Sequence, residues 1–289
     1  MHTLLITATQ LQDLQAQGTP CAVLDCSFDL MKPELADGLF AAEHIAGAWH
    51  AHLDRNLSTH NADEAVNGGR HPLPKREIVA QWLGSLGIHN GMQIVVYDQN
   101  KGFYCGRLWW MLKWLGHEAV AVLDGGLQAW KDIGGALASG PGPSPLPVPV
   151  PANFELKAPL RQLVLTEAVA NGLGRPEQTI VDARAGARFR GETEPLDPVA
   201  GHIPGALNRP FTENFNEDGR FKSPELLKAE WDHLLAGRSG SSVVHHCGSG
   251  VTAVPNVLAM ELAGFGPTAL YAGSWSEWSN TPGLPCAKG

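Results

Sequence analysis

The sequence predicts an α/β fold made of two tandem, doubly wound domains, each with a parallel sheet flanked by helices. Short apolar runs alternate with helix-like stretches along both halves of the 289-residue chain. Strand runs of about 4–6 residues between helical segments are typical of parallel sheets covered on both faces. Segments of the first half also recur in the second, which indicates an internal duplication.

The expected elements follow the same order in each half. In the first half the buried strands are expected at residues 21–24, 93–97 and 119–123, with helices at 78–86 and 106–115. In the second half the strands are expected at 179–181, 242–246 and 269–271, with helices at 224–235 and 253–263.

Three pairs of segments carry the duplication. They are Val23-Leu24-Asp25 with Ile180-Val181-Asp182, residues 43–48 with 201–206, and residues 123–130 with 271–278. Between the two halves, proline occupies every second position from Pro141 to Pro151. Such a run cannot join a helix or a central strand and is expected to be extended. We therefore predict a first domain at 1–138, a proline-rich linker at 139–153 and a second domain at 154–289.

Composition excludes several classes of protein. The chain has 21 basic and 29 acidic residues, a net charge of −8, which does not favour a nucleic-acid binder. No apolar run approaches the roughly 18 residues of a membrane span, and the start lacks a secretory signal, so a cytoplasmic protein is expected. The five cysteines form no C-x-x-C pair, which argues against a disulfide framework or a zinc site.

One stretch concentrates features of a reactive site. Residues 243–246 read as a buried strand that ends at Cys247, and Gly248-Ser249-Gly250 follow at once. In parallel sheets, ligands bind at the carboxyl ends of strands. A glycine-rich turn can gather backbone N–H groups into an anion-binding nest, and the next helix adds its positive end. All three features favour a thiolate at Cys247, and Pro255 fits the first turn of that helix.

The same stretch allows three other interpretations. A buried structural cysteine before a glycine turn is the first. A metal site would use His245 and His246, but adjacent strand residues point to opposite faces. A phosphatase loop would need an arginine six positions after the cysteine to clamp phosphate, and that position is Ala253.

The loop Cys247-Gly248-Ser249-Gly250-Val251-Thr252, in a duplicated α/β chain, resembles the tandem-domain rhodanese superfamily of sulfurtransferases. It is most similar to the loop of those members that use 3-mercaptopyruvate; members that use thiosulfate usually carry Arg-Lys at the positions of Gly248 and Ser249. The resemblance implies that Cys247 takes sulfur from 3-mercaptopyruvate, releasing pyruvate, and becomes a persulfide held by the loop residues Gly248, Ser249, Gly250, Val251 and Thr252. The sulfur would pass to cyanide, a small thiol or a protein thiol such as that of a thioredoxin-like protein, with no cofactor and no metal.

The two halves align without a gap from residues 98–111 to 247–260, so Asp98 stands where the nucleophile would be. The first domain is therefore expected to lack one, and Cys105 is expected to be structural. Because Gly248 and Ser249 are neutral, the loop is expected to offer no cation to dianionic thiosulfate. Thiosulfate as donor is the alternative, and a non-catalytic rhodanese-like binding module is a further one.

The resemblance also implies three supporting residues. Arg188 matches an arginine that binds the substrate carboxylate, whereas Arg184 is expected in a structural ion pair. The second substrate arginine of the family is missing from residues 192–197, and Arg190 is a possible substitute. Asp54 and His71, both expected in the first domain, match residues of a proton relay with Ser249.

Overall fold

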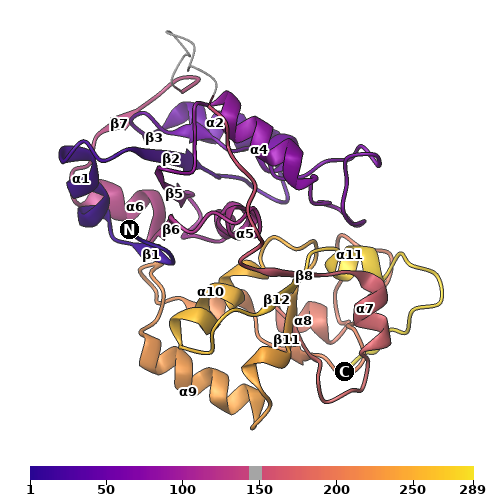
Figure 1. Cartoon of the computed structure of the whole chain (residues 1–289). Coiled ribbons are helices and arrows are strands. Elements are labelled where there is room, and N and C mark those ends of the chain that lie inside the picture. Colours follow the sequence, from indigo (N-terminus) through magenta and orange to yellow (C-terminus); the bar gives the residue numbers. More distant parts are fainter. Residues whose placement is uncertain (143–151) are drawn as a thin grey trace. The chain divides into compact units, whose positions relative to one another are not determined.

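The computed structural model describes residues 1–142 and 152–289, so most of the expected linker (residues 143–151) lies outside the described residues. The chain divides into two compact units, labelled by element in Figure 1. The first comprises Met1–Glu64, Pro74–Leu160 and Glu217–Arg220, and the second Ala65–Leu73, Arg161–Asn216 and Phe221–Gly289. Residues 65–73, which chain order places in the first half, thus pack within the second unit.

The first unit is built on a five-stranded sheet in which all neighbours are parallel, in the order β1-β6-β5-β2-β4. The strands are β1 (Leu5–Ile6), β2 (Cys21–Asp25), β4 (Trp49–His50), β5 (Gln93–Tyr97) and β6 (Val120–Leu123). A separate antiparallel pair joins β3 (His44–Ile45) to β7 (Leu137–Ala138). The helices are α1 (Ala8–Ala16), α2 (Ala36–Ala42), α3 (Leu53–Asn56), α4 (Arg76–Ser85), α5 (Gly106–Trp114) and α6 (Gly126–Asp132).

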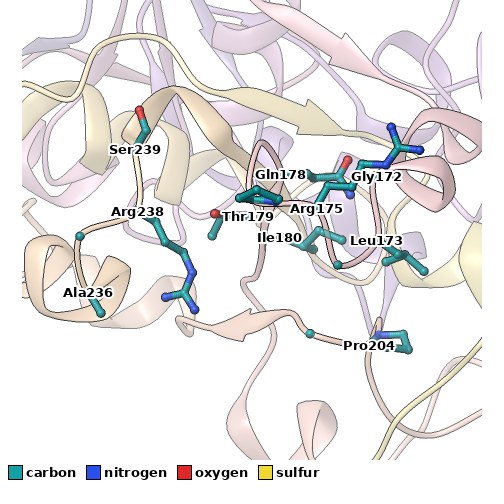
Figure 2. Close-up of a pocket in the computed structure, with 14 residues that line it drawn as sticks. Gly172, Leu173, Arg175, Gln178, Thr179, Ile180, Pro204, Ala236, Arg238 and Ser239 are labelled. Atoms are coloured by element: carbon teal, nitrogen blue, oxygen red, sulfur yellow. The ribbon is translucent and has the colours of Figure 1, made fainter.

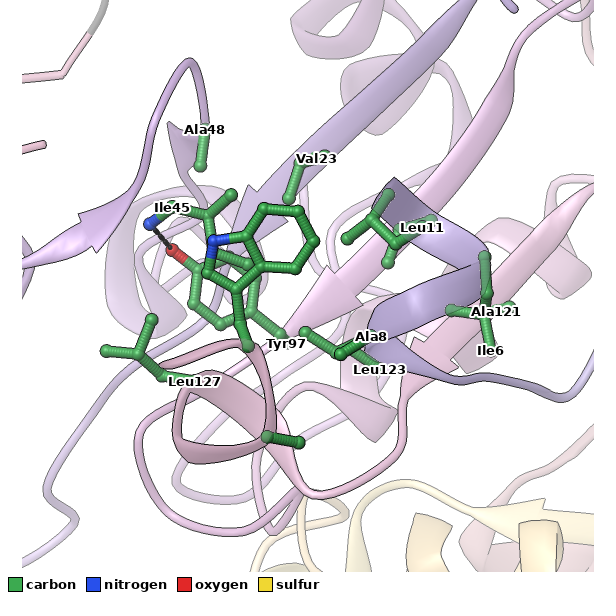
Figure 3. Close-up of a cluster of buried hydrophobic side chains, with 13 residues drawn as sticks. Ile6, Ala8, Leu11, Val23, Ile45, Ala48, Tyr97, Ala121, Leu123 and Leu127 are labelled. Carbon is green, nitrogen blue, oxygen red and sulfur yellow. Dashed lines mark hydrogen bonds between the residues drawn. The ribbon is translucent and has the colours of Figure 1, made fainter. Parts of the chain in front are cut away.

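Helices cover both faces of this sheet because successive strand residues point to opposite sides. Val95 and Tyr97 of β5 face α1 and α6, in a cluster with Leu11 and Trp130 (Figure 3). The Tyr97 hydroxyl, buried there, accepts a hydrogen bond of 2.9 Å from the backbone N–H of Ile45. On the other face α5 packs on β5 and β6, and all nine of its residues are buried.

The second unit repeats this design. Its sheet has the order β10-β9-β11-β12-β8, again with all neighbours parallel. The strands are β8 (Gln162–Val164), β9 (Thr179–Asp182), β10 (Leu207–Asn208), β11 (Val243–His246) and β12 (Ala269–Tyr271). The helices are α7 (Thr166–Asn171), α8 (Gly186–Phe189), α9 (Pro224–Leu235), α10 (Val254–Leu262) and α11 (Ser274–Trp278).

The two faces of the second sheet are also buried. Ile180, Val244 and Tyr271 pack with Trp275 and Trp278 of α11. On the opposite face α10 lies against β11 and β12, and α9 packs beside α10 (Figure 1). This arrangement presents the carboxyl end of β11, the central strand, together with the amino end of α10.

The prediction of two parallel α/β sheets flanked by helices is confirmed. Every strand and helix expected from the sequence is present, with ends shifted by at most a few residues. Among the described residues, no helix has both the length and the apolar character needed to cross a membrane.

Candidate active site

Cys247 directly follows the last residue of β11, at the carboxyl edge of the second sheet. Its backbone is fixed on both sides: its N–H donates to Ser274 Oγ at 3.1 Å, and its carbonyl accepts from the N–H of Trp275 at 3.0 Å. The side chain is almost fully buried, with 1% of its surface exposed. The thiol therefore has one defined position at the strand end, where parallel sheets bind ligands.

The loop after Cys247 needs glycine at position 250. Gly250 has φ +74°, and a Cβ there would lie 2.2 Å from the carbonyl oxygen of Ala272. Both the left-handed backbone and the close approach exclude a larger residue. The turn leads into α10, in which Pro255 occupies the first turn, as the sequence predicted.

Several backbone N–H groups of this loop lack an internal partner. Those of Ser249, Val251 and Ala253 donate no hydrogen bond to any atom of the described residues. A buried N–H group without a partner is costly. These groups, with the amino end of α10, are therefore available to an anion at the Cys247 side chain.

The first unit shows what such a loop does when an anion fills it. Asp98 follows β5 as Cys247 follows β11, and its carboxylate is fully buried. Its Oδ1 accepts from the N–H groups of Asn100 and Gly102, both at 2.8 Å. Its Oδ2 accepts from those of Tyr104 at 2.8 Å and Cys105 at 2.9 Å.

By the gap-free alignment, Asn100, Gly102 and Tyr104 correspond to Ser249, Val251 and Ala253. The first unit therefore carries the same loop with a carboxyl group in place of the nucleophile. This gives a physical reason for the sequence prediction that the first half has no reactive thiol at this position.

His71 and Ser249 are brought together by the structure. His71 Nδ1 and Ser249 Oγ lie 2.7 Å apart, and both residues are buried. His71 belongs to the second unit, because residues 65–73 pack there; the sequence placed it in the first domain. Asp54 lies in α3 of the first unit, and its part in a relay with His71 stays a prediction.

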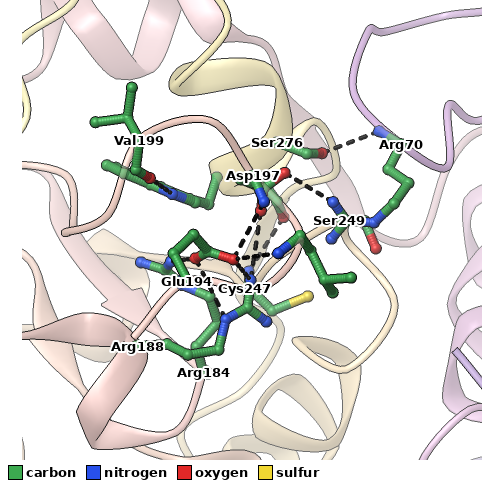
Figure 4. Close-up of polar contacts among 12 residues, drawn as sticks. Arg70, Arg184, Arg188, Glu194, Asp197, Val199, Cys247, Ser249 and Ser276 are labelled. Atoms are coloured by element: carbon green, nitrogen blue, oxygen red, sulfur yellow. Dashed lines mark hydrogen bonds and ion pairs between the residues drawn. The ribbon is translucent and has the colours of Figure 1, made fainter. Parts of the chain in front are cut away.

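Arg188 lies beside the loop within a network of ion pairs (Figure 4). Its Nη2 donates to Glu194 at 2.6 Å and lies 3.4 Å from Asp197. Arg184 binds Asp182 at 2.6 Å and Glu194 at 3.2 Å with almost no exposed surface, which confirms the expected structural ion pair. Arg190 is half-exposed and pairs with Glu192 instead.

The sequence reading missed Arg70. A Cβ built on Gly248 would lie 3.1 Å from Arg70 Nη2 and 3.6 Å from Arg188 Nη1, so two guanidinium groups face this glycine. The loop itself offers no cation, as expected, but two arginines from outside it lie near Gly248. The cations come from residues distant in sequence, which the loop's own composition cannot reveal. The only signal for Arg70 was its position directly before His71.

The two histidines before Cys247 point to opposite sides, as expected. His246 Nε2 lies 3.6 Å from Asp182 Oδ2, whereas His245 packs edge-on against Trp231 on the other face. Burial lowers the pKa of both imidazoles, that of His245 to about 3. No group of three or more His, Cys, Asp or Glu side chains in residues 1–142 and 152–289 is arranged to hold a metal ion.

The remaining four cysteines sit in environments that oppose ionisation. Burial raises the pKa of Cys21 to about 11 and those of Cys26 and Cys105 well above the ordinary value. It also raises the pKa of Cys286. Near neutral pH these side chains are thiols, the less nucleophilic form.

A hollow of about 670 Å³ lies elsewhere in the second unit (Figure 2). Thr179 at the amino end of β9 lines it, with Arg175 and Arg238 nearby. Because β9 and β11 are parallel, this is the end of the sheet opposite Cys247. None of the candidate active-site residues lines it.

Comparison with known proteins is consistent with this geometry. The family model described as "Rhodanese-like domain" matches residues 7–133 and 165–281. The chain is 43% identical to a Pseudomonas aeruginosa protein named "Probable 3-mercaptopyruvate sulfurtransferase", over 99% of this chain and 98% of that protein. It is 35% identical to the thiosulfate sulfurtransferase of Cricetulus griseus, over 90% of this chain and 86% of that protein.

A solved structure shares the whole fold. Escherichia coli SseA, described as a 3-mercaptopyruvate sulfotransferase with the rhodanese fold, superposes with a TM-score of 0.77 at 30% identity. The match covers 96% of this chain and 100% of that one. With two matching domains and similarity along nearly its full length, the chain belongs to the rhodanese-like family.

Proposed function

We propose that this protein is a sulfurtransferase that moves sulfur from 3-mercaptopyruvate, through a persulfide on Cys247, to a small nucleophilic acceptor. The observation that carries the proposal is the single thiol at the end of β11, beside loop N–H groups that have no partner among the described residues. The relatives named for this reaction support it.

In the first step the sulfur of Cys247 attacks the thiol sulfur of 3-mercaptopyruvate. An S–S bond forms and the C–S bond of the donor breaks, leaving its electron pair on carbon. The resulting enolate takes up one proton and becomes pyruvate, so that a cysteine thiol and the donor give a cysteine persulfide and pyruvate. The N–H groups of Ser249, Val251 and Ala253 stabilise negative charge on the sulfur during this exchange.

The hydrogen-bonded pair of His71 and Ser249 is the proposed source of that proton. The 2.7 Å contact couples the imidazole to the Ser249 hydroxyl. Ser249 is part of the loop of residues 247–252, here called the reactive loop. An imidazole can both donate and accept a proton through its two ring nitrogens, as a proton relay requires. Asp54 is proposed as a further member of this relay, on the family resemblance alone.

In the second step an acceptor attacks the outer sulfur and regenerates the Cys247 thiolate. With cyanide the products are thiocyanate and the free cysteine. Because Cys247 is 1% exposed, cyanide and small thiols are the acceptors that we propose first, and a thioredoxin-like protein second. A reducing cytoplasm would keep such a nucleophile unpaired, and all five cysteines are free in the structure.

Thiosulfate is the second candidate donor, because Arg70 and Arg188 both face Gly248. Their charges are balanced by Glu194 and Asp197, so the four groups sum to zero (two positive and two negative). A balanced pair of guanidinium groups favours a planar monoanionic carboxylate, bound by directed hydrogen bonds, over a dianion that depends on excess positive charge.

The test is a comparison of kcat/KM for 3-mercaptopyruvate and thiosulfate, with cyanide as the common acceptor. We expect 3-mercaptopyruvate to be the better donor, with pyruvate and thiocyanate formed in equal amounts. A preference for thiosulfate would overturn the choice of donor. Absence of thiocyanate from both donors would overturn sulfur transfer itself and favour a non-catalytic binding module.

A further inference from the structure

We infer that Arg70, from the segment of residues 65–73, is the second arm of a two-arginine site that binds the carboxylate of the donor together with Arg188. The inference rests on the proposed function and names a residue that sets its substrate class. The second unit supplies one arginine from α8, and residues 192–197, where a second was expected, contain none.

The two arginines meet over one point of the reactive loop. The position of a Cβ on Gly248 is 3.1 Å from Arg70 Nη2, and 3.6 Å and 3.7 Å from the two Nη atoms of Arg188. Gly248 is the residue next to Cys247. A carboxylate placed over Gly248 would therefore lie within reach of both guanidinium groups while the rest of the donor reaches toward the thiol.

Each arginine keeps a free donor on this side. Arg70 Nη1 binds Asp197 at 2.7 Å, and Arg188 uses Nε and Nη2 for Glu194. Arg70 Nη2 and Arg188 Nη1, the atoms nearest to Gly248, have no hydrogen-bond partner among the described residues. The acidic residues thus fix the guanidinium groups and leave two N–H edges for an incoming carboxylate.

The backbone that carries Arg70 is tied to the same unit. The N–H of Gly68 donates to Glu277 at 3.0 Å, and the N–H of Arg70 donates to Ser276 Oγ at 3.0 Å (Figure 4). Ser276 also contacts the loop after Cys247: its N–H donates to the Gly248 carbonyl at 2.8 Å. Ser276 of α11 therefore hydrogen-bonds both to the backbone of Arg70 and to that of Gly248.

Arg70 is also partly open to solvent. It lines a hollow of about 660 Å³ together with Leu196, Asp197 and Pro198. Its side chain is 29% exposed, whereas that of Asp197 is 2% exposed. The guanidinium of Arg70 is therefore more accessible than the Asp197 carboxylate that it binds.

A purely structural Arg70 would serve only to neutralise Asp197. The two roles predict different outcomes when Asp197→Asn is added to Arg70→Gln. If Arg70 only neutralises Asp197, the double variant should bind the carboxylate as the wild type does, because no uncompensated charge remains. If Arg70 binds the donor, the double variant should bind the carboxylate no better than Arg70→Gln.

The experiment measures binding of 3-mercaptopropionate and its uncharged amide, by NMR titration, to protein carrying Cys247→Ser so that no thiol exchange occurs. The pair differs only in the carboxylate, so the ratio of their Kd values reports on that group alone. Arg70→Gln should weaken binding of the acid by about tenfold to a hundredfold, the size expected for a charge-assisted hydrogen bond, and leave binding of the amide unchanged. Arg175→Gln, at the opposite end of the sheet, is the matched control and should change neither.

An unchanged ratio in Arg70→Gln, or wild-type binding of the acid by the double variant Arg70→Gln/Asp197→Asn, would overturn the inference. The wild-type donor assay separates this from failure of the proposed function. If 3-mercaptopyruvate is turned over but the ratio does not respond to Arg70→Gln, only the role of Arg70 is wrong. If the ratio responds but no sulfur is transferred, the carboxylate site stands and the reaction does not.

Discussion

Asp98→Asn should strongly destabilise the first unit, although that unit carries no proposed nucleophile. The Asp98 carboxylate accepts four backbone N–H bonds of 2.8–2.9 Å, two on each oxygen, and is fully buried. An asparagine keeps one oxygen and turns an NH₂ group toward the other two N–H groups. Two charge-assisted bonds are lost, and donors then face donors in a buried loop.

The magnitude follows from those two bonds. A hydrogen bond to a charged group contributes about 1.5–3 kcal/mol, so the loss is roughly 3–6 kcal/mol. This is a large share of the roughly 5–15 kcal/mol by which a typical protein is stable. The change should therefore be evident even if the loop relaxes and water satisfies part of it.

Urea unfolding and hydrogen exchange of residues 98–105 measure this effect globally and locally. Asp13→Asn, an exposed carboxylate on α1, is the control and should stay within about 0.5 kcal/mol of wild type. A loss below about 1 kcal/mol in Asp98→Asn, with unchanged exchange of the loop amides, would refute the claim that this carboxylate fills an anion nest.

Three further predictions concern the second unit. Arg188→Ala should raise KM for 3-mercaptopyruvate about tenfold to a hundredfold with little change in kcat. Arg190→Ala, which removes an exposed ion pair, is the control and should leave KM unchanged. The same KM and kcat in both variants would show that Arg188 lies outside the site. His71→Ala and Ser249→Ala should each lower kcat and change its pH profile, and the double variant should lose little more because the two act through one hydrogen bond; fully additive losses would contradict a shared relay. His245→Phe should make the protein less sensitive to acid: burial lowers the pKa of His245 from 6.5 to about 3, so the stability tied to its neutral form is complete above pH 6.5 and is lost as pH falls toward 3. The gap between variant and wild type in urea unfolding should grow by about 1.4 kcal/mol per pH unit below 6.5, and parallel curves would show that His245 is protonated in the folded protein.

The central strands could be predicted from the sequence because they are continuous apolar runs buried on both faces. The edge strands β1, β4, β8 and β10 could not, since they have only two or three residues and partly exposed side chains. Such short segments carry no periodicity, and their pairing depends on the neighbouring strand.

The site residues also differ in how far the sequence predicts them. Cys247 and its loop were predictable because strand, glycine turn and helix start are adjacent in sequence. The pairing of His71 with Ser249 spans 178 positions and came only from the family resemblance. Arg70 was not predicted as a site residue, because its proposed role depends on residues 65–73 packing in the second unit, which no local sequence pattern encodes.

In the proposed reaction, Cys247 carries the sulfur between donor and acceptor. The most direct measurement is the intact mass of the protein after treatment with 3-mercaptopyruvate and removal of excess donor, followed by peptide mapping. We predict one added sulfur atom, located on Cys247, lost on addition of cyanide and absent from Cys247→Ser. Sulfur on Cys105 or another cysteine, or full turnover by Cys247→Ser, would show that Cys247 is not the sulfur carrier.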